Sequence, residues 1–185
     1  RGSAQPSMTP NGRYVAFASN ASTITPTDTN GTSGDIFVRD LQLDTTTLVS
    51  RSTAGNQVSY GSNLPTISDD GTKVSFTNNG GGLTPGDTNF VSDVFVRNLT
   101  TGVTTKISTD LGGGEADHDV LYTRLSGDGT TVVWQSLSGE YTNGGGNGHV
   151  HIWKRVGTNP IVRVSVNAAG DLADNDSSRP TISKD

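Results

Sequence analysis

The stretch TDTNGTSGDIFVRD, from Thr27 to Asp40, returns later in the chain as GDTNFVSDVFVRN, from Gly86 to Asn98. Each copy joins a cluster of acidic and amide side chains to a segment of β-branched and aromatic residues. The second part has the composition of a β-strand, and the first part has that of a turn or loop. Because the same pairing occurs twice, we interpret it as part of an internal repeat.

The repeat extends along the whole chain. Glycines in short polar turns recur about 58 residues apart, at Gly12, Gly71 and Gly129. Each unit contains four short segments with strand composition, separated by glycine-containing turns. In the second unit, these segments are LPTIS, KVSFT, DVFVRN and VTTKIS, within 64–108. No amphipathic helical pattern interrupts them, so the sequence predicts an all-β fold.

One aromatic column runs through the units. Phe17, Phe76 and Trp134 occupy the same place in the second strand of each unit. Alternation puts them on the same sheet face as neighbouring valines. We interpret this column as core packing rather than as a platform for ligand stacking.

Four antiparallel strands per unit, repeated around an axis, are the plan of a β-propeller blade. The pattern P-x-[IM]-[ST]-x-[DN]-G-x-x-V-x-F followed by D-[IV]-F-V-R resembles the TolB-type, WD-like propeller repeat of bacterial surface and periplasmic proteins. It is especially similar to the long-repeat secreted form that carries an Asp-Thr-Asn loop. The resemblance implies a propeller fold and an extracellular or periplasmic location. It says little about activity, because this scaffold hosts many functions.

The pattern predicts one propeller region over 1–185, with blades at about 3–55, 56–113 and 114–170. Residues 171–185 copy the start of a blade and are expected to supply the first strand of a fourth. Three blades do not close a ring, since propellers have about four to eight. We expect the ring to be completed by more chain or by oligomerisation.

The acidic and amide loops are candidate calcium sites. The six candidate ligands are Asp28, Asn30 and Asp35 in the first unit and Asp87, Asn89 and Asp93 in the second. Calcium prefers hard oxygen ligands, and this spacing resembles the first half of known calcium loops. The alternative is that these side chains cap turns by hydrogen bonds without an ion. The third unit has His149, Val150 or His151 where the last aspartate would fall, so it is expected to have lost the site.

A second acidic group precedes the first strands of two units, near the expected mouth of the central channel. Its members are Glu115, Asp117, His118, Asp119, Asp171, Asp174 and Asp176. They could bind a cation, a sugar or a cationic partner, or they could form ordinary solvated turns. Four aromatic residues are candidates for stacking on a sugar: Tyr60, Tyr122, Tyr141 and Trp153.

Composition narrows the function classes. The net charge of −5 argues against a nucleic-acid partner, since phosphate binding needs a basic face. No apolar run is long enough to span a membrane. The absence of cysteine excludes disulfides and thiolate metal sites, and no Gly-x-Ser-x-Gly or phosphate-loop motif occurs.

The sequence therefore favours a non-enzymatic, calcium-braced extracellular scaffold that binds a protein or glycan through its loop face. Two alternatives remain. One is a structural subunit that self-associates through its terminal blades. The other is part of a propeller lyase or hydrolase, which clustering of the mouth acids around one pocket would favour.

Overall fold

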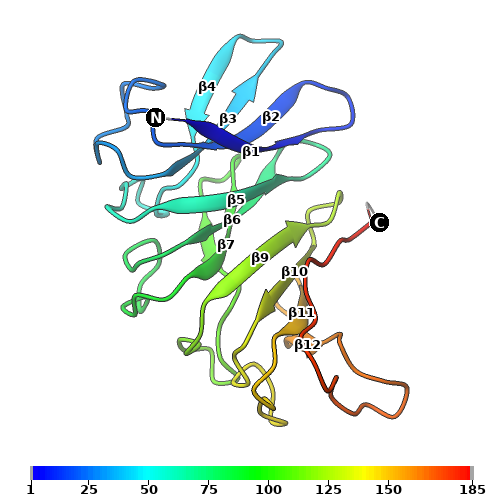
Figure 1. Cartoon of the computed structure of the whole chain (residues 1–185). Coiled ribbons are helices and arrows are strands. Elements are labelled where there is room, and N and C mark those ends of the chain that lie inside the picture. The colour runs from blue at the N-terminus through cyan, green and yellow to red at the C-terminus, as the bar shows by residue number, and fades with distance from the viewer. Residues whose placement is uncertain (1, 184–185) are drawn as a thin grey trace.

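The computed structural model describes residues 2–183, which form three four-stranded antiparallel sheets (Figure 1). Blade 1 contains β1 (Ser3–Met8), β2 (Tyr14–Ser19), β3 (Asp35–Asp40) and β4 (Thr45–Leu48). Blade 2 contains β5 (Ser62–Ile67), β6 (Lys73–Asn78), β7 (Asp93–Asn98) and β8 (Thr104–Lys106). Blade 3 contains β9 (Val120–Leu125), β10 (Thr131–Ser136), β11 (His151–Val156) and β12 (Val162–Arg163).

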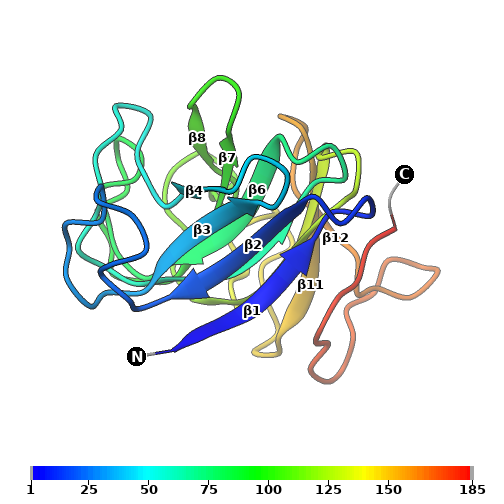
Figure 2. The same ribbon diagram turned by 90° about the horizontal axis from the view of Figure 1, so that it is seen from above.

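The strands of each sheet follow one another in chain order. The innermost strands β1, β5 and β9 lie side by side, and the sheets stack face to face in Figures 1 and 2. This arrangement confirms the expected all-β, partial propeller. One end of each sheet carries the long loop between its second and third strands; we call it the loop end. The opposite end carries the short turns and is called the hairpin end. Residues 2–183 contain no helix with the length and apolarity that crossing a membrane requires.

Proline shapes the innermost strands of blades 1 and 2. The pairing of β1 with β2 shifts register between Ala4 and Ser7, and β5 with β6 shifts between Asn63 and Thr66. Both shifts surround an X-Pro pair, since proline has no N–H to donate to the ladder. The residue before each proline has a positive φ, 54° at Gln5 and 55° at Leu64.

Blades 2 and 3 each pack an aromatic face on the aliphatic face of the preceding blade. Phe76 and Phe95 of blade 2 are fully buried against small and aliphatic side chains of blade 1, which are Ala16, Ala18, Ile36 and Val38. Trp134 and Trp153 of blade 3 are fully buried in the same way against blade 2. Burial of apolar area is the main favourable contribution to folding, so these junctions hold the blades together.

The predicted aromatic column is therefore core, with one difference. Phe76 and Trp134 are completely buried, whereas Phe17 is only half-buried. Phe17 lies on the face of blade 1 that no earlier blade covers within residues 2–183.

The segment expected to begin a fourth blade occupies the place of an innermost strand without forming one. The amide of Ser177 donates to the carbonyl of Val150, at 2.8 Å. The same bond joins β5 and β9 to the blades before them, from Ser62 to Gly34 and from Val120 to Ser92. Within 171–183 there is no strand, because a strand needs a partner to complete its hydrogen-bonded ladder.

Candidate functional site

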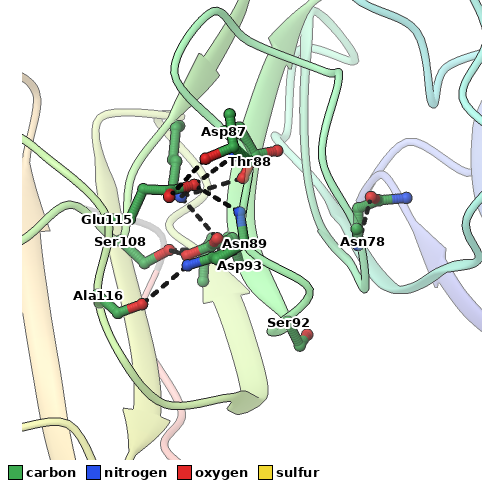
Figure 3. Close-up of polar contacts among 12 residues, drawn as sticks. Asn78, Asp87, Thr88, Asn89, Ser92, Asp93, Ser108, Glu115 and Ala116 are labelled. Atoms are coloured by element: carbon green, nitrogen blue, oxygen red, sulfur yellow. Dashed lines mark hydrogen bonds and ion pairs between the residues drawn. The ribbon is translucent and has the colours of Figure 1, made fainter.

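In blade 2, an ammonium group joins the two predicted aspartate ligands. Nζ of Lys106 lies 3.1 Å from Oδ1 of Asp87 and 2.6 Å from Oδ2 of Asp93. The Lys106 side chain is 9% exposed and those of the aspartates 1% and 2%, so all three are removed from water. We call these residues, together with Glu115, the blade 2 cluster (Figure 3).

Glu115 connects this cluster to the start of blade 3. One of its oxygens lies 3.7 Å from Nζ of Lys106 and also accepts hydrogen bonds from the amides of Thr88 and Asn89. The side-chain amide of Asn89 donates to the carbonyl of Ala116, at 3.0 Å. The long loop is thus fixed to the segment that leads into the next blade, as Figure 3 shows.

The charges in the blade 2 cluster shift each other's protonation. Burial alone would lower the pKa of Lys106, but the hydrogen bonds and charges of Asp93 and Asp87 raise it. Burial raises the pKa of Asp87 and of Asp93, even though Lys106 opposes this shift. Three carboxylates around a single ammonium explain why the lysine holds its proton so firmly.

Blade 1 builds the same geometry from different residues. Nε2 of Gln57 donates to Asp28 at 3.0 Å and to Asp35 at 2.9 Å. Oε1 of Gln57 accepts from the amide of Thr29 at 2.8 Å, as Glu115 does in blade 2. The position of Lys106 is taken by Leu48. We call Asp28, Asp35 and Gln57 the blade 1 cluster.

A serine supports the second aspartate of each cluster. Ser50 donates to Asp35 and Ser108 donates to Asp93, both at 2.6 Å. Each serine oxygen also accepts the backbone amide that follows its aspartate. These serines were not predicted as site residues, although their recurrence at the end of each fourth strand was a usable signal.

Blade 3 shows which residue replaces the aspartate. His151 opens β11 as Asp35 opens β3, and its Nδ1 lies 3.1 Å from Oγ of Ser165, the third supporting serine. Arg163 takes the place of Lys106 and donates to the carbonyl of Gly145. Burial, followed by the charge of Arg163, lowers the pKa of His151. The structure thus selects His151 among the three residues that the sequence left open.

The asparagine of each loop has the same partner in all three blades. Asn30, Asn89 and Asn147 donate their side-chain amides to the carbonyls of Val58, Ala116 and Ala173, at 2.8–3.0 Å. These bonds hold the loops without an ion, but they reach the segment before the next blade, 26–28 residues away, rather than capping a local turn. We call these bonds the asparagine bridges.

Some side-chain oxygen atoms in and beside the clusters have no hydrogen-bond partner among the described residues and could therefore bind a cation. Within residues 2–183, Oδ1 of Asn30, Oδ1 of Asn89 and Oδ2 of Asp87 are buried without a hydrogen-bond partner. These are ligand types that calcium accepts. No three carboxylate, imidazole or thiolate groups of the described residues converge as a metal-ligand set. A cation in blade 1 would thus need amide and carbonyl oxygens beside Asp28 and Asp35.

The predicted mouth acids do not share one pocket. Glu115 belongs to the blade 2 cluster. Asp119 accepts the amide of Ser92 at 2.6 Å, and Asp176 accepts the equivalent amide of Val150 at 2.8 Å. These two acids therefore tie a loop to the following blade.

The remaining mouth residues are spread out. Asp117 lies 2.7 Å from Nδ1 of His118 and accepts a bond from Ser138. Burial would raise the pKa of Asp117, but these hydrogen bonds lower it. Asp171 bonds to Asn167, and Asp174 is exposed. Glu115 and Asp117 both have lowered pKa values, unlike a general acid.

A groove of about 510 Å³ lies at the loop end, where the innermost strands of all three blades contribute lining residues. Phe90 forms one wall and is 71% exposed. Tyr60 contacts it edge-on, with ring centroids 5.6 Å apart. The rest of the lining is mixed, with polar groups from Gln5, Asn63 and Asp119 and aliphatic side chains from Leu64, Val120 and Leu121. We call this the loop-end groove.

The aromatic candidates need a correction. Tyr141 and Trp153 are 1% and 0% exposed, because they fill the core of blade 3, so they cannot stack on a sugar. Tyr60 is 42% exposed and remains available. Tyr122 lies under the guanidinium of Arg124. Phe90 was missed, although an aromatic residue inside a polar loop was a visible signal.

Comparisons with known proteins identify the fold. No protein-family model and no curated protein matches the sequence. Among solved structures, TolB from Acinetobacter baumannii superimposes with a TM-score of 0.54 and 17% identity, covering 92% of this chain and 33% of TolB. The β-propeller domain of the Trilobed protease from Pyrococcus furiosus gives a TM-score of 0.54 and 16% identity, with coverages of 86% and 40%. The tricorn protease gives a TM-score of 0.52 and 11% identity, covering 84% of this chain and 14% of the tricorn chain.

At these identities, the likeness shows the fold alone. It confirms a TolB-like β-propeller. The chain spans less than half the length of each of these solved chains.

Proposed function

We propose that this TolB-like propeller segment is a non-enzymatic binding module that recognises a protein or glycan through its loop end. The observation that carries the proposal is the exposure of Phe90 at 71% on the wall of the loop-end groove. Phe90 does not stand alone, because the exposed ring of Tyr60 contacts it edge-on, and an exposed aromatic surface bordered by polar groups is typical of a site that a partner covers. An extracellular or periplasmic location is part of this proposal and is supported by the resemblance of the repeat.

The chemistry of the groove suits such a partner. Phe90 and Tyr60 offer an aromatic surface, and the amides of Gln5 and Asn63 and the carboxylate of Asp119 offer hydrogen bonds. A few fixed polar groups beside an apolar surface are typical of binding sites. The asparagine bridges and the two clusters hold the loops in place, so little ordering is needed on binding.

Calcium bracing belongs to the proposal for blade 1. Asp28 and Asp35 carry two negative charges that only a neutral amide bridges, and Oδ1 of Asn30 is buried without a partner in the described residues. In blade 2, the ammonium of Lys106 already lies between Asp87 and Asp93. The candidate ligands Asp87, Asn89 and Asp93 therefore have less need of an ion.

One observation favours association through the terminal blades as a second candidate. Arg97 and Arg155 donate to carbonyls of the preceding blade, at Arg51 and Ile107. The equivalent Arg39 contacts Asp44 of its own turn instead. We propose that the open face of blade 1 receives a further blade, and the mass of the protein in solution tests whether a second copy supplies it.

Substitution of Phe90 tests the binding proposal. The wild-type protein and Phe90→Ser would be compared on a glycan array and against candidate protein ligands by surface plasmon resonance. Loss of a saturable signal in Phe90→Ser is expected. Leu43→Ser is the control, since Leu43 is 64% exposed on a turn at the hairpin end of blade 1. Equal binding by wild type and Phe90→Ser would contradict the proposal.

A further inference from the structure

The two junctions between blades differ at the hairpin end. Between blades 1 and 2, the ring of Tyr14 covers Gly71 so closely that a Cβ added there would lie 2.4 Å from the ring. Leu99 packs into the same core cluster as Tyr14. The Leu99 amide bonds to the carbonyl of Thr72, which fixes its position. Tyr14 and Leu99 together fill this end of the first junction.

Between blades 2 and 3, both filling side chains are replaced. Lys73 takes the place of Tyr14, with its stem over Gly129 as the tyrosine lies over Gly71. Gly157 takes the place of Leu99, and its amide makes the equivalent bond to Thr130, at 2.8 Å. A flexible lysine thus replaces an aromatic ring, and a glycine replaces a leucine. The space that these smaller groups leave unfilled is a pocket of about 390 Å³.

The walls of this pocket are mainly apolar, and its charged groups are cationic. The aliphatic lining residues are Val96, Val103, Ile107 and Val132. Lys73 and Arg155 supply positive charge, and among the described residues no carboxylate lines the pocket. Val103 is 43% exposed at the rim, so the pocket opens to solvent.

The cations are held but not neutralised by the pocket. Nζ of Lys73 donates to the carbonyl of Gly129, and Nη1 of Arg155 donates to the carbonyl of Ile107, both at 2.9 Å. Nε of Arg155 is buried without a hydrogen-bond partner in the part of the chain that the structure describes. The nearby carboxylates of Asp70 and Asp128 accept bonds within their own turns, from Thr72 and Thr130.

We infer that this pocket binds a small amphipathic carboxylate, with its aliphatic body against the valines and its carboxylate near Arg155 and Lys73. The volume is that of an ordinary small-molecule site. Burying an aliphatic chain is favourable, and a carboxylate satisfies a guanidinium better than a neutral group does. The pocket is at the opposite end of the blades from the loop-end groove, so this inference does not depend on the proposed function.

Octanoate and octanol are the probes. Their binding is measured from the NMR chemical shifts of methyl groups that line the pocket, on Val96, Val103, Ile107 and Val132. We expect saturable shifts with octanoate in wild type and clearly weaker binding of octanol. Lys73→Tyr copies the filled junction and should weaken octanoate binding at least about tenfold. Tyr14→Phe, at the other junction, is the matched control and should leave the affinity unchanged.

A second variant separates charge from shape. Lys73→Met keeps an aliphatic stem and removes the ammonium, so octanoate should bind several-fold more weakly while octanol is unaffected. Absence of saturable shifts in wild type, or equal affinity for octanoate and octanol, would overturn the inference. Equal octanoate binding by folded Lys73→Tyr would do the same, because the ligand would then lie elsewhere.

Discussion

The clusters of blades 1 and 2 hold two aspartates in the same geometry by different chemistry. In blade 1, a neutral amide from Gln57 bridges them, and Leu48 takes the place of Lys106 in the fourth strand. In blade 2, Lys106 bridges them, and Glu115 replaces the glutamine. Three carboxylates with one ammonium carry the same formal charge as two carboxylates with an amide. The added lysine and the added glutamate thus compensate each other.

This difference shows that the repeat preserves an arrangement rather than particular residues. A buried ammonium without its carboxylates, or buried carboxylates without their ammonium, would strongly destabilise the fold. Because both changes lie in one contact network, their energetic effects should be coupled. Exchanging residues between the clusters can test this, and the following predictions run from the largest effect to the smallest.

Lys106→Leu, which copies blade 1 at one position only, should have the largest effect. It leaves Asp87 and Asp93 buried without their counter-charge, so the free energy of unfolding should fall by about 3–5 kcal/mol. Urea denaturation followed by tryptophan fluorescence measures this. The double variant Lys106→Leu/Glu115→Gln completes the blade 1 arrangement and should recover most of the loss. If the double variant were as unstable as the sum of the single variants, the two clusters would not be equivalent.

The second largest effect should be stabilisation by calcium, which we expect in the blade 1 cluster and not in the blade 2 cluster. We expect calcium at a hundredfold excess over its Kd to stabilise the wild-type protein by about 2.7 kcal/mol relative to chelator. Thermal melting in calcium and in EDTA measures the shift. Asp28→Asn should abolish it, whereas Asp87→Asn should keep it, because Lys106 already serves blade 2. A calcium effect that survived Asp28→Asn would exclude the blade 1 cluster as its source.

The asparagine bridges should contribute less to the free energy of unfolding than the charged cluster does, and each bridge should contribute a similar amount. Asn89→Ala removes the bond to the carbonyl of Ala116 and should cost about 1–1.5 kcal/mol. Asn30→Ala should cost a similar amount, since its bond to the carbonyl of Val58 is equivalent. Chemical denaturation in EDTA is the measurement, with the exposed Asn143→Ala as control. A loss in one blade only would mean that the bridges are not the shared element.

The smallest effect concerns pH. Burial raises the pKa of Asp35, although hydrogen bonds from Ser50 and Asn30 oppose the shift. The folded protein therefore binds this proton more readily than the unfolded chain. The unfavourable contribution of Asp35 is present at neutral pH and disappears as the pH falls through its raised pKa. Carboxyl NMR titration should show this, and Gln57→Glu should raise the value further; a midpoint below 3.8 would contradict it.

The sequence anticipated those features that repeat as local patterns. The spacing of Gly12, Gly71 and Gly129 indicated the unit, and alternation identified Phe76 and Trp134 as core. The polar loops were recognised as sites of interest for the same reason, since their residues are close in the chain. The partners that complete the clusters, Lys106 and Gln57, come from other segments and were not predicted.

What the sequence determined by itself is the blade, because strand alternation and turn glycines act over a few residues. What only the tertiary structure decided is the content of each junction. It placed an amide and an ammonium beside the serine-bound aspartates of blades 1 and 2, and an imidazole beside the serine of blade 3. It also assigned His151 within an ambiguous loop and left a pocket where Lys73 and Gly157 replace Tyr14 and Leu99. These outcomes depend on side chains from two blades meeting in three dimensions, and a repeat pattern contains no information on which of them will touch.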